Sequence, residues 1–512
     1  VGIWKSTNAN TPAVVPVFAR LSGGFPPSTA TAATTSNPGL RRIEFAVGAG
    51  AASNVVFAAV ADPNSNLFGL FRSADAGATW THVDNGANGN GTITSTSQFT
   101  TSSGSIPASA VGRKLIMRNT VSGRVFARPI TAVAGNVITV ITTAAAGGTL
   151  VTSADAYTWS VSNYPLFCNG QCSYDMTIAM DPLDATGNTV YVGGNPNAFN
   201  GNTAPVACGS PTPTAAACRH SLWRTTDGGV TWRGISQGDG VSGGVHTDDH
   251  ELVFDPTDVS APARLYNGND GGIWSTDNGG TSWKSLNTNL AITQFQSISL
   301  HPTDTGVVLG GTQDNGTNIL GRGAVAAPAW FHTDFGDGGQ SAIDRTNSNI
   351  MYHTYFNQSN NFFGPAISTT GGGNGPGNWS DAIGFAGPVA CGNGMDITDQ
   401  VSFYAPLALM RPDVGGVRDI IYFGSDTLYR NANPGPVLDD GMGGCIAPNA
   451  WTAVSADLVN GFLSAIATHD VRQGGNEVVY AAASTGAIFT VPTGVAASAA
   501  CPGAGCPTWV TI

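Results

Sequence analysis

The sequence predicts an all-β protein built from repeated units of about four short strands, and three observations support this class. First, the segment LFRSADAGATW, which ends at Trp80, recurs as LWRTTDGGVTW ending at Trp232 and as IWSTDNGGTSW ending at Trp283. Second, short β-type runs alternate with turns, and no long stretch has the helical apolar period. Third, 68 Gly and 29 Pro, with only 11% charged residues, are typical of a turn-rich chain.

Each copy of the repeat predicts a closed turn between two strands. The Asp or Asn side chain accepts turn N–H groups, Gly adopts a backbone angle that other residues avoid, and Trp packs beneath the turn. The residues assigned to this role are Ser73, Asp75, Gly77 and Trp80, then Thr225, Asp227, Gly229 and Trp232, then Thr276, Asn278, Gly280 and Trp283. A decayed fourth copy runs from Ile3 to Asn10.

This S/T-x-D-x-G-x-T/S-W pattern is similar to the Asp-box of BNR-repeat β-propellers. That superfamily includes sialidases, xyloglucan-hydrolysing glycosidases and sortilin-type receptors. The stretch from His246 to Asp344, with HTDDHELVFDP and GGTQDNGT, resembles most the unassigned secreted bacterial members. The resemblance implies a β-propeller fold, whereas the F/Y-R-I-P signature of sialidases is absent.

The last strand expected in each repeat unit carries an aromatic residue, which we call the closing aromatic, and these residues extend the repeat along the chain. Their closest intervals are 51, 47 and 49 residues, the length of one four-stranded blade. The eight residues are Phe18, Trp80, Trp232, Trp283, Trp330, Trp379, Trp451 and Trp509. We therefore expect seven or eight four-stranded blades over residues 1–90 and 163–512. Residues 91–162 contain no copy of the Asp-box at the spacing of the repeat. We expect them to form an inserted small β-barrel or β-sandwich module. The first unit begins at its third strand, so we expect the chain to be a fragment of a longer polypeptide.

Charge and cysteine usage narrow the function classes. The net charge of −12 without basic clusters argues against a nucleic-acid partner, and no apolar run is long enough to form a transmembrane segment. The cysteines lie in loop-like sequence without the C-x2-C spacing of zinc sites, so we expect four disulfides in a secreted protein. The expected pairs are Cys168 with Cys172, Cys208 with Cys218, Cys391 with Cys445, and Cys501 with Cys506.

Polar side chains are predicted to gather on the face opposite the repeat turns. His246, Asp248 and His250 follow an i, i+2, i+4 pattern, which places three side chains on one side of an extended strand. Two imidazoles and a carboxylate can bind a divalent metal, with Asp270 or Asp314 completing the shell. The alternative is that these groups cap loop N–H bonds and connect adjacent blades.

The same face offers paired carboxylates. Asp248, Asp270, Asp314 and Asp337 lie in loops expected to converge, together with Asp334, and such pairs can perform acid–base work on a glycosidic bond. Aspartates in Gly-rich segments also serve as turn formers.

Aromatic residues suggest a sugar platform. Trp223 and Trp274 occupy matching repeat positions, which favours packing. The run YFNQSNNFF is not repeated, so Tyr355, Phe356, Phe362 and Phe363 are the predicted ligand contacts.

The sequence thus predicts a secreted binding or scaffold protein, whose partner is a polysaccharide or an extracellular protein surface. A glycoside hydrolase that uses the paired aspartates is the alternative, and whether the chain is an enzyme stays open at this point.

Overall fold

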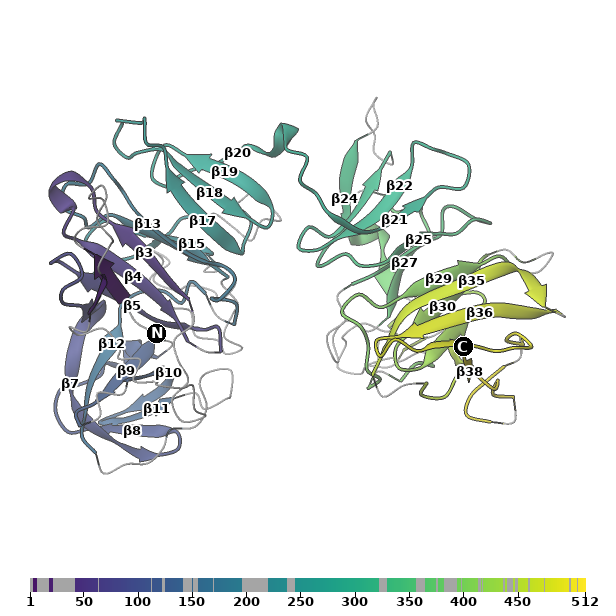
Figure 1. The fold of residues 1–512 in the computed structure, drawn as a ribbon, viewed down its shortest axis with the longest axis horizontal. Coiled ribbons are helices and arrows are strands. Elements are labelled where there is room, and N and C mark those ends of the chain that lie inside the picture. Colours follow the sequence, from purple (N-terminus) through teal and green to yellow (C-terminus); the bar gives the residue numbers. More distant parts are fainter. Residues whose placement is uncertain are drawn as a thin grey trace. The chain divides into compact units, whose positions relative to one another are not determined.

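The fold is all-β, and successive antiparallel four-stranded sheets have the sequential topology of propeller blades (Figure 1). The computed structural model describes residues 3–6, 18–21, 42–62, 64–111, 113–121, 125–140, 150, 155–168, 170–195, 220–236, 245–321, 329–355, 364–373, 376–381, 394–396, 398–412, 416, 418–435, 438–439, 445–446, 450–458, 461–473, 475–496, 499–503 and 505–512. Within these residues the helical turns are the short 3-10 segments Gly50–Ala52, Ala108–Ala110, Asn287–Asn289 and Pro376–Asn378. None of the helices described could span a membrane. The chain divides into two units, Val1–Ala291 and Ile292–Ile512.

The described part of the first unit contains three four-stranded sheets. They are β3 (Ile43–Val47), β4 (Val56–Ala61), β5 (Leu67–Ser73) and β6 (Thr81–His82); β13 (Met176–Met180), β14 (Val190–Gly194), β15 (Leu222–Thr225) and β16 (Arg233–Gly234); and β17 (Asp249–Phe254), β18 (Leu265–Asn269), β19 (Gly272–Thr276) and β20 (Lys284–Ser285). Strand β13 packs against both β3 and β17. The apolar core lies between neighbouring sheets, where Phe57, Leu70 and Ile178 are buried together. Strands β1 (Ile3–Ser6) and β2 (Phe18–Leu21) form a separate pair.

A closed six-stranded barrel interrupts the run of sheets. Its strands are β7 (Asp84–Ser95), β8 (Gln98–Thr101), β9 (Lys114–Asn119), β10 (Val125–Ala134), β11 (Val137–Val140) and β12 (Tyr157–Ser162). The barrel includes the region 91–162, but it begins earlier, because β7 starts directly after β6. It has its own core, which contains Phe99, Leu115 and Trp159.

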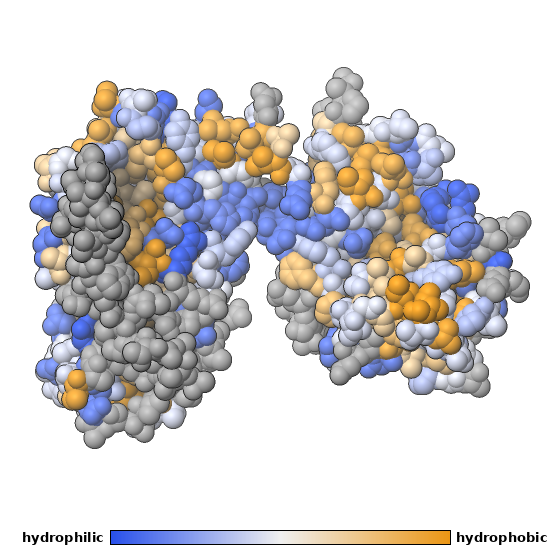
Figure 2. All heavy atoms as spheres, in the orientation of Figure 1, coloured by the Kyte–Doolittle hydropathy of each residue, from blue (hydrophilic) through white to orange (hydrophobic). Residues whose placement is uncertain are grey.

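The described part of the second unit contains four four-stranded sheets and one short pair. They are β21 (Phe295–Leu300), β22 (Val308–Thr312), β23 (Thr317–Leu320) and β24 (Trp330–Asp334); β25 (Ser341–Ile343), β26 (Met351–Thr354), β27 (Pro365–Ser368) and β28 (Ser380–Asp381); β29 (Leu407–Met410), β30 (Ile420–Gly424), β31 (Leu428–Asn431) and β34 (Thr452–Ala453); β35 (Leu463–Gln473), β36 (Asn476–Ala483), β37 (Ile488–Thr490) and β38 (Val510–Thr511); and the pair β32 (Leu438–Asp439) and β33 (Cys445–Ile446). Figure 2 shows apolar side chains over β35 and β36.

The repeat turns are held by side-chain contacts to the backbone. In the first turn, Gly77 N donates to Ser73 Oγ at 2.8 Å, Thr79 N donates to Asp75 Oδ1 at 2.8 Å, and Trp80 Nε1 donates to Gly77 O at 2.9 Å. The φ angle of Gly77 is +89°, which L side chains rarely adopt. The turn therefore requires the residue types that the repeat supplies.

The other two repeat turns reproduce these contacts with one difference. Gly229 N and Gly280 N each donate to the preceding Thr hydroxyl at 3.0 Å. Trp232 Nε1 donates within its own turn, to Gly229 O, whereas Trp283 Nε1 donates to Ile235 O in the neighbouring sheet. The third turn therefore also connects two sheets.

The second unit contains a related turn that the repeat pattern does not predict. Gly372 N donates to Ser368 Oγ at 3.0 Å, as Gly77 does to Ser73. Thr370 stands where the other copies have Asp or Asn, so the acidic signature is lost while the backbone contact survives.

Candidate functional site

Acidic residues gather at one end of two adjacent sheets in the first unit. In the β17–β20 sheet Asp249 pairs with Asn269, and Asn269 pairs with Gly272, so Asp248 and Asp270 lie at the same sheet end. The repeat turn after Thr276 lies at the other end, because Leu265 pairs with both Thr276 and Phe254. In the β13–β16 sheet, Met176 pairs with Gly194, and Asp175 directly precedes this pair.

His250 and Asp270 form a close pair at this end. His250 Nε2 lies 2.5 Å from Asp270 Oδ1, and their side chains are 32% and 13% exposed. The ring of Tyr174 contacts the imidazole edge-on, with centroids 4.6 Å apart. The hydrogen bond to Asp270 raises the pKa of His250, although partial burial acts in the opposite direction. The pair therefore holds a proton at a partly exposed position.

Asp248 presents a second carboxylate beside Asp270. One of its oxygens lies within 4.8 Å of a carboxylate oxygen of Asp270. Thr247 Oγ1 donates to Asp248 Oδ2 at 2.8 Å, and Gln171 Nε2 approaches Oδ1 at 3.5 Å. The backbone of Asp248 has φ +62°, a conformation in which non-glycine residues are uncommon and Asp is among the tolerated ones. Asp248 is 9% exposed, so its side chain is mostly enclosed.

Two buried aspartates beneath this pair were not predicted as site residues. Asp175 has no exposed surface, and burial first, then the hydrogen bond and charge of Asp248, raise its pKa to about 10. Asp249 is also fully buried and accepts a bond from Asn267 Nδ2 at 2.8 Å. Burial raises the pKa of Asp249 to about 7. An internal repeat would have found both: Asp175 stands six residues before Asp181, which Pro182 follows, and Asp249 stands six residues before Asp255, which Pro256 follows.

A disulfide loop carries part of the site. Cys168 and Cys172 are bonded, and the loop that they close carries Gln171, whose Oε1 accepts a bond from Asn195 Nδ2 at 2.9 Å. This pair and Cys501–Cys506 confirm two of the four predicted disulfides. Side chains of the other two predicted pairs, Cys208 with Cys218 and Cys391 with Cys445, lie outside the described residues.

The strand alternation expected for His246, Asp248 and His250 is wrong. The backbone is bent at Asp248, and the ladder shifts register between Asp249 and Glu251, so the three residues do not follow one extended strand. His246 Nδ1 lies 2.9 Å from Thr247 O, and His250 is bound to Asp270. Metal binding by these three residues stays a prediction. The structure does not support the reason given for it, because the three residues do not alternate along one extended strand.

The other predicted acids belong to the second unit. Asp337 Oδ1 accepts a bond from the backbone N–H of Asp314 at 2.9 Å, so these two residues are in contact. Asp334 is buried, and its Oδ2 lies 2.8 Å from His353 Nε2 and 2.5 Å from the hydroxyl of Tyr355. Convergence of all four predicted catalytic aspartates stays a prediction.

The predicted aromatic platform is corrected at Tyr355. Its side chain is 5% exposed, because the hydroxyl is bound to Asp334 and the ring packs edge-on against His353 at 4.6 Å. Such a ring offers no face to a sugar. Phe356, Phe362 and Phe363 lie outside the described residues.

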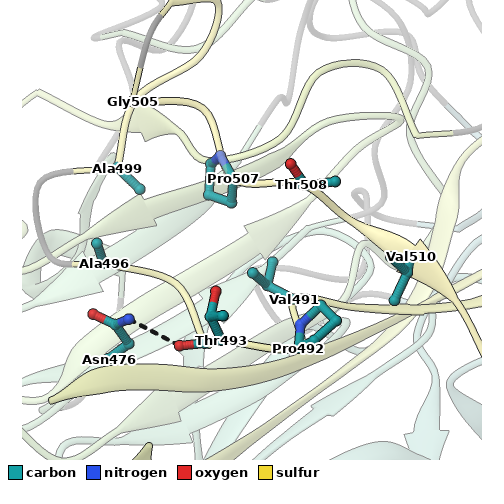
Figure 3. Close-up of a pocket in the computed structure, with 11 residues that line it drawn as sticks. Asn476, Val491, Pro492, Thr493, Ala496, Ala499, Gly505, Pro507, Thr508 and Val510 are labelled. Carbon is teal, nitrogen blue, oxygen red and sulfur yellow. Dashed lines mark hydrogen bonds between the residues drawn. The ribbon is translucent and has the colours of Figure 1, made fainter. Parts of the chain in front are cut away.

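A surface pocket of about 420 Å³ lies near the C-terminal end of the second unit (Figure 3). Val491, Pro492 and Val510 supply apolar walls, and Asn476 Nδ2 donates to Thr493 O at 2.8 Å. No ionisable side chain is among the residues that line it. The pocket therefore offers no acid or base.

Comparisons with known proteins leave the family unassigned. No protein-family model and no curated protein matches the sequence. Solved structures that resemble the chain include the GH74 enzyme of Niastella koreensis, at 13% identity and TM-score 0.19, covering 92% of this chain and 65% of that one. The GH74 xyloglucanase of Xanthomonas campestris gives 13% identity and TM-score 0.23, covering 91% and 66%. An ancestral GH74 enzyme gives 11% and 0.20, covering 92% and 62%. The chain thus spans less than two thirds of each of these proteins, and at such TM-scores we draw no argument from them.

Proposed function

We propose that the chain is a secreted carbohydrate-active enzyme of the Asp-box propeller class, which hydrolyses a glycosidic bond at Asp248 and Asp270. The observation that carries this proposal is the pairing of two carboxylates, within 4.8 Å, whose surroundings differ. Asp270 is bound to His250, whereas Asp248 lies beside the buried Asp175. Pairs of acids with different environments are typical of acid–base catalysis.

A double-displacement reaction needs a carboxylate nucleophile and a proton donor, and Asp248 and the Asp270–His250 pair supply one of each. The Asp248 carboxylate attacks the anomeric carbon as the glycosidic C–O bond breaks, and the leaving oxygen takes the proton shared by Asp270 and His250. Water then cleaves the glycosyl ester on Asp248 and returns a proton to Asp270. Atoms and charge balance over the two steps.

Secretion and a polysaccharide partner belong to the same proposal. The two disulfides described are typical of proteins from an oxidising compartment. The repeat turns, with their Ser or Thr hydroxyl and Asp or Asn side chain in matching contacts, support membership of the Asp-box class.

The alternative is a binding or scaffold protein. The pocket beside Val491 favours it, because a site without ionisable groups can bind but cannot perform acid–base chemistry.

Single substitutions separate these two functions. Asp248→Asn and Asp270→Asn should each lower polysaccharide hydrolysis by roughly 10²–10⁴-fold, since an acid or base contributes about that much. Reducing-end release from a polysaccharide panel measures it. The matched control is Asp258→Asn, a turn carboxylate of the same unit that accepts a bond from Ser260 N at 2.9 Å. Parent protein that releases no reducing ends from any polysaccharide would favour the binding function.

A further inference from the structure

We propose that Tyr174 is a sugar-binding residue, whose ring stacks against a neutral pyranose unit of the polysaccharide on which Asp248 and Asp270 act. The link to hydrolysis rests on the function proposed above, whereas the binding of a sugar by Tyr174 can be tested without it. The aromatic platform expected from the sequence was Tyr355, and that side chain is buried.

Tyr174 lies at the edge of the candidate site and is accessible to solvent. It is 58% exposed, more than any other Phe, Tyr or Trp residue that the structure describes. Its ring centroid lies 4.6 Å from that of His250, and the two ring planes are 84° apart, so this contact covers at most one face of the phenol ring. His250 Nε2 in turn lies 2.5 Å from Asp270 Oδ1. An accessible aromatic ring therefore lies one side chain away from the proposed proton donor.

The backbone at Tyr174 is held by hydrogen bonds. Tyr174 N donates to Gln171 O at 2.6 Å, and Gln171 lies in the loop closed by the Cys168–Cys172 disulfide. The carbonyl oxygen of Tyr174 accepts a bond from Arg42 Nη1. A backbone that is already fixed lowers the entropy cost of ordering the ring against a ligand.

The same loop is also bound to the turn between β4 and β5. Ser65 Oγ and Ser173 Oγ are 2.6 Å apart, and Cys172 N donates to Ser65 O at 2.8 Å. Gly170 N donates to Asn66 Oδ1 at 3.1 Å. The loop that presents the ring is therefore anchored to a neighbouring sheet, as a binding residue requires if its position is to be fixed before the ligand arrives.

The surrounding charges favour a neutral sugar. The C–H groups on the face of a pyranose ring are apolar and can pack on an aromatic ring, while the hydroxyl groups at the sugar's edge stay hydrated. The carboxylates of Asp248 and Asp270 lie beside a single imidazole, that of His250. The guanidinium of Arg42 is paired with Glu44 at 2.7 Å. Because excess carboxylates repel an anionic polymer, the position suits a neutral glycan better than a polyuronate.

Affinity electrophoresis of the purified full chain tests sugar binding without a need for turnover. The probes are a soluble β-glucan and a galactomannan, which are neutral, and polygalacturonate, which is anionic. The parent should bind at least one neutral polysaccharide more tightly than polygalacturonate. Tyr174→Ala should weaken this binding about threefold to tenfold, and Tyr174→Phe, which keeps the ring, should stay within about twofold of the parent. Tyr480→Ala, which removes a 41% exposed tyrosine from the second unit, is the matched control and should bind as the parent does.

The inference is wrong if the parent binds none of these polysaccharides, if it prefers polygalacturonate, or if Tyr174→Ala binds as tightly as the parent. Because Tyr174 is exposed, the fold should survive its replacement, and equal thermal denaturation midpoints of parent and variant check this. Should Tyr174→Ala lower the midpoint, Tyr174→Leu, which keeps bulk beside His250 but has no flat ring, takes its place in the comparison with Tyr174→Phe.

Kinetics separate sugar binding from support of His250. If Tyr174 contacts the substrate in the ground state and the transition state alike, Tyr174→Ala should raise KM about threefold to tenfold and leave kcat within a few-fold. If the ring only held the imidazole beside Asp270, kcat would fall while KM stayed the same, and that result would count against the inference.

Failure of this inference and failure of the proposed function give different results. Hydrolysis that is lost in Asp248→Asn but unchanged in Tyr174→Ala would support the proposed function and overturn the role of Tyr174. Polysaccharide binding that depends on Tyr174, in a parent that releases no reducing ends, would overturn the proposed function and leave Tyr174 as part of a sugar-binding site.

Discussion

Ser73 shows how much one hydroxyl group contributes to a repeat turn. It is 1% exposed and accepts the backbone N–H of Gly77 where water does not reach. We expect Ser73→Ala to lower the free energy of unfolding by about 1–3 kcal/mol, because it leaves a buried donor unsatisfied. Denaturant titration measures the change. Val121→Ala, at an 83% exposed position, is the control and should stay within about 0.5 kcal/mol of the parent.

The pKa of Asp227 predicts how the stability of the protein changes at acid pH. Burial alone would raise its pKa, but hydrogen bonds from Thr231 and Thr225 outweigh this and lower it. A lowered folded-state pKa means that the stabilisation is present above the unfolded value near 4 and is lost as pH falls through the folded value. The parent should therefore lose more stability between pH 6 and pH 2 than Asp227→Asn. Denaturation midpoints across this range test it, and parallel curves would contradict it.

Among the elements, the barrel of β7 to β12 is the most independent. Its closed sheet encloses a separate core, and its ends meet where Ser162 pairs with Asp84. We expect residues 84–162 expressed alone to unfold cooperatively, because the core comes from the barrel's own strands. Circular dichroism during thermal unfolding checks this, and a chain without a transition would show that the barrel depends on its neighbour.

The same element is also attached to its neighbour. Ile116 and Ala127 of the barrel pack with Phe71 and Trp80 of the β3–β6 sheet. Replacing 84–162 by a short Gly-Ser linker should therefore leave the sheets folded but expose apolar surface, which binding of a hydrophobic dye would detect. Unchanged dye binding would mean that this contact is not maintained in solution.

The elements that the sequence predicted well are those fixed by local chemistry. Every fourth strand of the described sheets begins at or directly after its predicted closing aromatic, as β16 does after Trp232 and β34 does after Trp451. The blade count of the complete ring stays a prediction. The turn at Ser368 could not be recognised from the acidic residue of the repeat, since Gly372 N still donates to Ser368 Oγ although Thr370 replaces the Asp or Asn.

At the scale of the whole molecule, apolar cores lie between successive sheets within each unit. In the second unit Tyr352 of one sheet packs with Phe423 of the next, as Phe57 and Val190 do in the first. Such cores require only short apolar runs in the strands, which can be recognised in the sequence. The functional site requires side chains from different sheets, and no period in the sequence encodes which loops will meet.

By itself, the sequence determined the all-β fold class, the repeated turns and two disulfides between close cysteines, because each depends on residues near one another in the chain. Tertiary structure decided which of the candidate site residues come together and how their side chains are held. It buried Asp175 against Asp248. It bent the backbone at Asp248, so that His246 and His250 have different hydrogen-bond partners. It also buried the side chain of Tyr355. The physical reason is that burial and the proximity of charges set the behaviour of a carboxyl group, and both arise only when sheets far apart in the sequence pack together.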